Sequence, residues 1–111
     1  MCNARHPANL RFFGAPVGLF FTIDDYLEQG SWFDYGMFVQ NIMTAARAFG
    51  LATCPQQAWA KYAKLIKPHL GYPDDHTLIC GMALGYEDTS HVVNELRTVR
   101  EPVADFTTFQ D

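Results

Sequence analysis

Residues 31–57, SWFDYGMFVQNIMTAARAFGLATCPQQ, decide the fold that we expect, because they join a long apolar helix to a sharply ended polar loop. Ser31 is a preferred N-cap residue, and Asp34 can complete a capping box with it. Apolar residues follow at helical spacing as far as Phe49, and Gly50 can take the left-handed conformation that ends a helix. The sequence therefore predicts a helix from Ser31 to Phe49.

The end of this stretch predicts a loop over Leu51–Gln56, since Pro55 disfavours renewed helix. The helix before the loop is apolar around most of its circumference, which predicts burial on several sides. Backbone N–H groups of residues 52–58 follow one helix and begin another, where they can donate to a planar, electron-rich ligand. This segment is our first candidate for a binding site.

The composition is that of one folded domain over residues 1–111, with 49% hydrophobic and 14% aromatic residues. A formal net charge of -4 and the lack of a basic run argue against a nucleic-acid or anionic-membrane surface. No apolar run is long enough for a membrane span, and Met1–Asn9 lacks the apolar segment of a secretory signal. Three cysteines without metal-type spacing fit a reducing compartment, so we expect a soluble, cytoplasmic protein.

Two continuous apolar runs predict strands that are covered on both faces. The first is Val17–Ile23, which we expect to be a central strand, and the second is Thr77–Leu84. Between them, Ala58–Ile66 has helical spacing, and Pro68 should bend or end that helix. Helices mixed with strands in this way predict an α+β fold.

The two ends of the chain differ from this middle part. Met1–Asn9 shows no periodicity and predicts an irregular lead-in. The tail over residues 94–111 is too short to bury its own apolar side chains, and its segment 106–109 alternates like an edge strand. We therefore expect the tail to lie on a partner subunit, in a dimer or a larger assembly.

Few residues carry a recognisable chemical motif. Cys54 would need a base and a lowered thiol pKa to act as a nucleophile, and Asp74-Asp75 is typical of a solvated turn. Gly81 and Gly85 have G-x-x-x-G spacing inside a strand, where their expected role is to let neighbouring elements approach closely. We assign no catalytic side chain and no metal ligand.

Arg97 and Arg100 are candidates for binding a phosphate group. A planar guanidinium group matches phosphate oxygens at good geometry. From the residues alone, each arginine is equally well explained as a solvated charge.

Six motifs, taken together and in order, resemble the FMN-dependent nitroreductase family. They are APVGLFFTID (15–24), WFDYGMFVQNIM (32–43), GLATCPQQA (50–58), LGYPDD (70–75), ICGMALGY (79–86) and NELRTVREPVADFTTF (94–109). The resemblance covers residues 9–111 and corresponds to the C-terminal half of such proteins. We therefore expect a truncated member without the N-terminal, Arg- and Ser-rich segment that holds the flavin phosphate and ribityl chain.

The resemblance implies a nitroreductase-like α-β-α sandwich that forms an obligate homodimer, with FMN at the subunit interface. The long helix would lie in that interface, and the C-terminal tail would be swapped onto the partner. The family's flavin-ring loop matches Pro55, Gln56, Gln57 and Ala58, its phosphate contact matches Arg100, and Arg97 is a weaker match. The flavin would take a hydride from NAD(P)H and then reduce a nitroaromatic or a quinone, in a ping-pong sequence.

Two readings of the function stay open at this point. One is an FMN-dependent oxidoreductase of this type, or half of one. The other is a non-catalytic dimeric remnant that keeps the interface and has lost the flavin. A module for another flat ligand is a third, weaker alternative.

Overall fold

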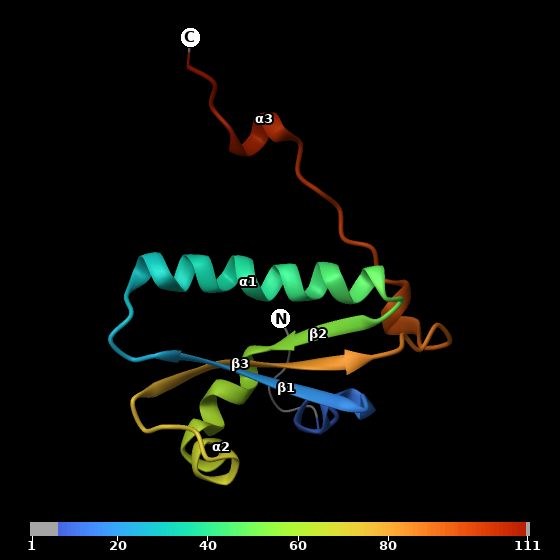
Figure 1. Ribbon diagram of the computed structural model, residues 1–111. Coiled ribbons are helices and arrows are strands. Elements are labelled where there is room, and N and C mark those ends of the chain that lie inside the picture. The colour runs from blue at the N-terminus through green and yellow to red at the C-terminus, as the bar shows by residue number, and fades with distance from the viewer. Residues whose placement is uncertain (1–6, 111) are drawn as a thin grey trace.

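The computed structural model describes residues 7–110 (Figure 1). With η denoting a 3-10 helix, its elements are η1 (Asn9–Gly14), β1 (Val17–Asp24), α1 (Gln29–Ala48), β2 (Ala52–Gln56), η2 (Gln57–Tyr62), α2 (Ala63–Leu70), β3 (His76–Gly85), η3 (Val92–Glu95) and α3 (Val103–Phe106). Helices thus alternate with the strands of one antiparallel sheet, which confirms the predicted α+β fold.

The three strands are ordered β1-β3-β2. β1 pairs with β3 along its whole length, whereas β2 pairs only with the second half of β3, where Gln56 lies opposite Gly81. Both strands predicted from apolar runs are therefore confirmed. The prediction that residues 17–23 form a central strand is wrong within the described chain, because β3 alone borders β1.

Both faces of the sheet are covered, which explains why successive strand residues are apolar. Figure 1 shows α1 across one face and α2 on the other side of the sheet. On the other side, η1 and η2 bring Phe12 and Trp59 against Phe20, with centroid distances of 5.4 Å from Phe12 and 5.3 Å from Trp59. Under α1 the core is Phe21, Cys80 and Met82, and the residues packed against it are Leu19, Tyr35, Val39, Ile42, Met43 and Ile79.

The long helix has the predicted end but a different start. α1 begins at Gln29, so Ser31 lies inside the helix, and its predicted N-cap role is wrong. Glu28 is the N-cap residue in an extended conformation, and the indole Nε1 of Trp32 donates to the Leu27 carbonyl at 3.0 Å. A side-chain bond between residues five positions apart therefore accompanies a helix start that the capping signal did not predict.

At its other end, α1 closes as the sequence predicts. Gly50 has φ 72°, its N–H donates to the Arg47 carbonyl, and the Leu51 N–H donates to the Ala46 carbonyl. These are the two bonds of a Schellman motif. The glycine is required because a residue with a Cβ rarely adopts this φ.

The segment after α1 is not the loop that Pro55 suggested. Ala52–Gln56 is a strand, and Pro55 sits in it opposite Met82. β2 is an edge strand, where a residue without an N–H is tolerated on the side that has no neighbour. The loop was predicted because Pro55 disfavours helix, but proline does not exclude an edge strand.

The predicted helix over Ala58–Ile66 is also corrected. Residues 57–62 form the 3-10 helix η2, and α2 then runs through Pro68 to Leu70. Gly71, at φ 69°, follows as its C-cap. Pro68 therefore lies inside α2 and does not end it, although the helix stops two residues later.

At the two ends of the chain the predictions are tested only in part. Residues 1–6 of the predicted lead-in lie outside the described residues, and Asn9 is not irregular, because it begins η1 and is only 3% exposed. Phe106 ends the short helix α3, and residues 107–110 belong to no strand in the described chain, so pairing of the tail with a partner's sheet stays a prediction. Among residues 7–110, no helix combines the length and the apolar character that a bilayer crossing needs.

Candidate functional site

The four residues predicted to lie beside a flavin ring come together at one corner of the sheet. Pro55 and Gln56 end β2, and Gln57 and Ala58 open η2. We call residues 55–59 the β2–η2 corner. The first N–H groups of a helix have no acceptor inside it, so those of Gln57 and Ala58 can donate to a bound molecule.

Gln56 turns its side chain into the protein rather than toward solvent. It is 3% exposed, and its Nε2 donates to the main-chain oxygen of Asn9 at 2.6 Å and to Asn9 Oδ1 at 2.7 Å. These bonds tie η1 to the corner across 47 residues of sequence. Sequence reasoning missed Asn9, because a single asparagine in an aperiodic segment carries no local signal of such a contact.

Trp59 closes the corner over the sheet. Its indole stacks on Phe12 with ring centroids 4.8 Å apart and lies directly over Gly81. A Cβ on Gly81 would collide with that indole, and one on Gly85 would lie 2.8 Å from Pro16 Cδ. The close approach predicted for these two glycines is confirmed.

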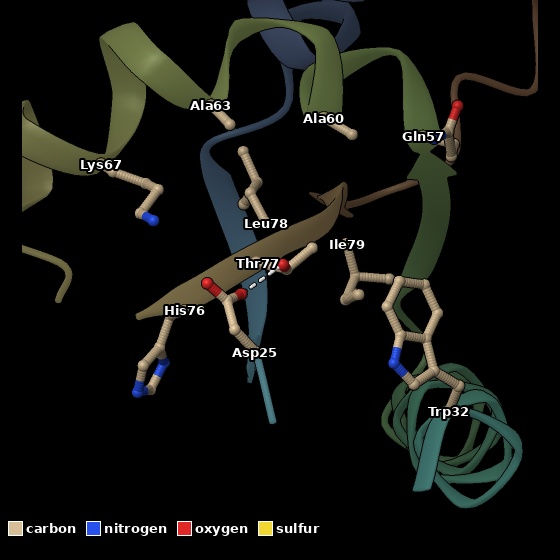
Figure 2. A pocket seen from close by; sticks show the side chains of 10 residues that line it. All are labelled: Asp25, Trp32, Gln57, Ala60, Ala63, Lys67, His76, Thr77, Leu78 and Ile79. Carbon is tan, nitrogen blue, oxygen red and sulfur yellow. Dashed lines mark hydrogen bonds between the residues drawn. The ribbon is translucent and has the colours of Figure 1, made fainter. Parts of the chain in front are cut away.

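A cavity of about 390 Å³ opens beside the corner (Figure 2). Gln57 and Trp32 lie at one end of it in this view, and Lys67 and His76 lie at the other. The volume falls in the range of small-molecule sites, roughly 300–1,000 Å³. Its full lining is Asp25, Trp32, Gln57, Ala60, Ala63, Lys67, His76, Thr77, Leu78 and Ile79.

The polar groups at the far end of this cavity already have partners. His76 Nε2 lies 2.8 Å from Asp24 Oδ1, and the Lys67 ammonium donates to the Asp74 carbonyl at 2.7 Å. The side chains of Asp25 and Thr77 are hydrogen-bonded to each other. This end is therefore a bonded network that borders the cavity.

The two candidate arginines lie far from the corner in one copy of the chain. The tail leaves the sheet near the end of α1 and extends away from the body of the protein (Figure 1). Arg97 Nη1 donates to the carbonyls of Asn94 and Leu96, at 2.9 Å and 3.2 Å, and Arg100 bonds to Thr98. One chain therefore does not bring its arginines to residues 55–58.

Among residues 7–110, the buried Cys80 thiol is not activated as a nucleophile. Burial raises the pKa of the Cys80 thiol, so this side chain is a neutral core residue near pH 7. Asp74 and Asp75 are exposed in a turn, as predicted. Within residues 7–110, the acidic, histidine and cysteine side chains form no cluster of three that could hold a metal ion. The arrangement can position a flat ligand in the cavity beside the His76–Asp24 pair.

A comparison with known protein families identifies a matching family. The model described as Nitroreductase family matches residues 3–86. The match includes β1, α1, the β2–η2 corner and β3.

Individual relatives agree with this match. A 4-nitrobenzoate reductase of Pseudomonas putida is 52% identical over 101 residues, which make up 91% of this chain and 44% of that protein. The solved FMN- and NADPH-dependent nitroreductase NfnB of a Sphigopyxis strain superposes with a TM-score of 0.89 at 36% identity, over 93% of this chain and 46% of that one. NfnB of Mycobacterium smegmatis, solved in complex with NADPH, gives a TM-score of 0.88 at 32% identity, over 94% and 46%. The chain thus spans less than half the length of each of these relatives.

Proposed function

This chain belongs to the nitroreductase family, and we propose that it forms part of an FMN-dependent oxidoreductase that passes electrons from NAD(P)H to a nitroaromatic or quinone. The observation that carries the proposal is the β2–η2 corner, which keeps the N–H groups of Gln57 and Ala58 free of helical acceptors beside a cavity. The relatives support it, since they are named as 4-nitrobenzoate reductase and as FMN- and NADPH-dependent nitroreductase.

The residues at the corner fit the ring of a flavin. An isoalloxazine edge presents a ring nitrogen and carbonyl oxygens, which accept hydrogen bonds from N–H donors. Pro55 is exposed and has no N–H, while Gln57 and Ala58 supply two donors in succession. Main-chain donors held by a strand and a helix are fixed in position, so they can favour one orientation of the ring.

The phosphate side of the cofactor is not complete in one chain. Arg100 and Arg97 are exposed and bond only to neighbouring tail atoms within the described chain. For Arg100 to meet a phosphate near the corner, the tail of one copy would have to reach the corner of another. We therefore propose a homodimer in which each flavin site draws its ring contacts from one subunit and Arg100 from the other.

When bound, FMN supplies the hydride chemistry, accepting electrons from a nicotinamide and passing them on to the second substrate. The chain itself binds and orients. Gln57 and Ala58 hold the ring edge, Arg100 neutralises phosphate charge, and the aromatic residues under the corner keep water from the sheet. We assign no proton transfer to a side chain of this site.

The experiment is a titration of FMN into the purified chain, followed by addition of NAD(P)H and then of 4-nitrobenzoate. Binding should quench flavin fluorescence, NAD(P)H should bleach the flavin absorbance, and the nitro compound should restore it. Binding without bleaching would limit the proposal to cofactor binding. No binding at micromolar FMN would favour the second candidate, which is a non-catalytic dimer. The exposed apolar side chains of the tail and of the outer face of α1 support a dimer independently of the flavin.

A further inference from the structure

Two separate contacts join η1 to the β2–η2 corner. One is the pair of hydrogen bonds from Gln56 Nε2 to Asn9, and the other is the stack of Phe12 on Trp59. Each contact reaches a residue that flanks Gln57 and Ala58 in the sequence. The corner is therefore held at both ends by one short element from elsewhere in the chain.

The backbone of η1 is strained where it makes these contacts. Phe12 and Phe13 have φ values of 50° and 54°, in the left-handed region that bulky side chains avoid. Such conformations persist when the surroundings impose them, and they are common at functional sites. Here the strained turn places the Phe12 ring between Trp59 and Gly18, whose missing Cβ leaves room for it.

The two polar atoms of the Gln56 side chain differ in their partners. Within residues 7–110, its Oε1 is buried without a hydrogen-bond partner. An unpaired buried acceptor loses its hydration without compensation, but an apolar side chain here would leave two buried oxygens of Asn9 without their donor. What offsets the cost of the unpaired Oε1 is the Nε2 group, which donates to two oxygens of Asn9 where β2 ends and η2 begins.

We propose that the buried Asn9–Gln56 pair is a positioning device, which holds the N–H groups of Gln57 and Ala58 at the orientation that the flavin ring needs. The pair itself touches neither cofactor nor substrate. The role of this device in flavin binding rests on the proposed function, but its effect on the corner does not.

The first arm of the test needs no flavin. Gln56→Met keeps the length of the side chain and removes both bonds to Asn9. The ¹⁵N order parameters of the Gln57 and Ala58 amides should fall from the rigid range, about 0.85, toward the flexible range below about 0.6. Asn9→Ala, which removes only the Oδ1 acceptor, should give a smaller fall. Amides in the middle of β3 should not change, and they report whether the variant is still folded.

The second arm compares FMN with riboflavin, which lacks the phosphate. If the Asn9–Gln56 pair orients the ring, Gln56→Met should lower the affinities for FMN and riboflavin by the same factor, about tenfold. It should also shift the absorption spectrum of the bound flavin. Gln29→Met, an exposed glutamine at the start of α1, is the matched control and should bind as the unmodified chain does.

The outcomes separate this inference from the proposed function. Unchanged order parameters at Gln57 and Ala58 in a folded Gln56→Met variant overturn the positioning role, whatever the flavin does. Lowered order parameters in a chain that binds no flavin support the positioning role of the Asn9–Gln56 pair and count against the proposed function. Lowered order parameters with unchanged affinity for both ligands would show that the ring does not use these N–H groups, and that would also overturn the inference.

Discussion

The β2–η2 corner and the C-terminal tail carry parts of the same predicted site, but the structure treats them in opposite ways. At the corner, Gln56 is 3% exposed and is bonded to a residue 47 positions away. In the tail, Val99 is 92% exposed and Phe109 is 77% exposed. One chain therefore organises the ring side of the site by its own contacts and leaves the phosphate side without a surface.

The difference indicates where the proposed partner would add contacts. Exposed apolar side chains in a row have no stabilising contact in one copy, whereas the same side chains laid on a partner would bury area and gain free energy. The outer face of α1 shows the same feature, with Phe33 and Phe38 exposed. The predictions that follow test this contrast between a self-sufficient corner and a dependent tail.

The largest effect is expected in the tail. Deleting residues 105–111 removes Phe106 and Phe109, each worth about 1.5–3 kcal/mol if it is fully buried on a partner. Sedimentation over a range of concentrations should show a dimer that dissociates at much lower concentration than the unmodified protein requires. Leu65→Ala, an exposed leucine on α2, is the control. An unchanged dimer affinity, or a folded monomer at micromolar concentration before any deletion, would contradict the dependence of the tail on a partner.

The next effect concerns the core beneath α1. Met82 has 0% exposure, and Met82→Ala should lower the free energy of unfolding by about 2–5 kcal/mol, because it leaves a cavity. Met37→Ala, on the exposed side of α1, should cost much less in the monomer. Urea unfolding of both variants measures the contrast. Equal losses would mean that the outer face of α1 is as well covered as the core, and therefore that a partner is present.

A smaller effect should distinguish binding of the flavin phosphate from binding of the flavin ring. Arg100→Ala should lower the affinity for FMN by about tenfold to a hundredfold. This corresponds to about 1.5–3 kcal/mol, the value of hydrogen bonds to a charged group. Riboflavin binding should not change, because riboflavin has no phosphate. Gln57→Ala should cost little, since its proposed contact uses the main chain, and Lys64→Ala on α2 is the charge control. Equal FMN affinities for Arg100→Ala and the unmodified chain would remove Arg100 from the site.

The smallest effect is a pH dependence of the free energy of unfolding, which arises from Tyr35 on α1. Burial, followed by the charges of Cys80 and Tyr72, raises the pKa of Tyr35 above its ordinary 10.0. A raised folded-state pKa means that the stabilisation is complete below pH 10.0 and is lost as the pH rises through the folded-state pKa. The Tyr35 hydroxyl also donates to the Thr22 carbonyl at 2.8 Å.

Tyr35→Phe tests this linkage. Near pH 7 the variant should be less stable by about 0.5–1.5 kcal/mol, because it lacks that hydrogen bond. Above pH 10 the difference should narrow, since phenylalanine cannot ionise. Tyr86→Phe, an exposed site, should show no such change, and parallel stability curves for Tyr35→Phe and the unmodified chain would contradict the prediction.

Local signals in the sequence predicted most of the secondary structure. The apolar runs became β1 and β3, and Gly50 ended α1 where its conformational freedom suggested. Signals that depend on the neighbourhood failed. Pro55 disfavours helix locally, but only the place of β2 at the edge of the sheet permits a strand there, and the start of α1 lies two residues before the capping motif.

The sequence by itself determined the family, the strands β1 and β3, the long helix and the residues of the candidate site, because periodicity and ordered motifs are written in neighbouring positions. Only the tertiary structure decided which of those residues meet. The Asn9–Gln56 pair is made by folding together segments with no shared pattern, and the separation of Arg100 from the corner follows from a tail that has no surface to pack on in one chain. The physical reason is that burial and hydrogen bonding at these points depend on residues far away in sequence, and no local propensity encodes them.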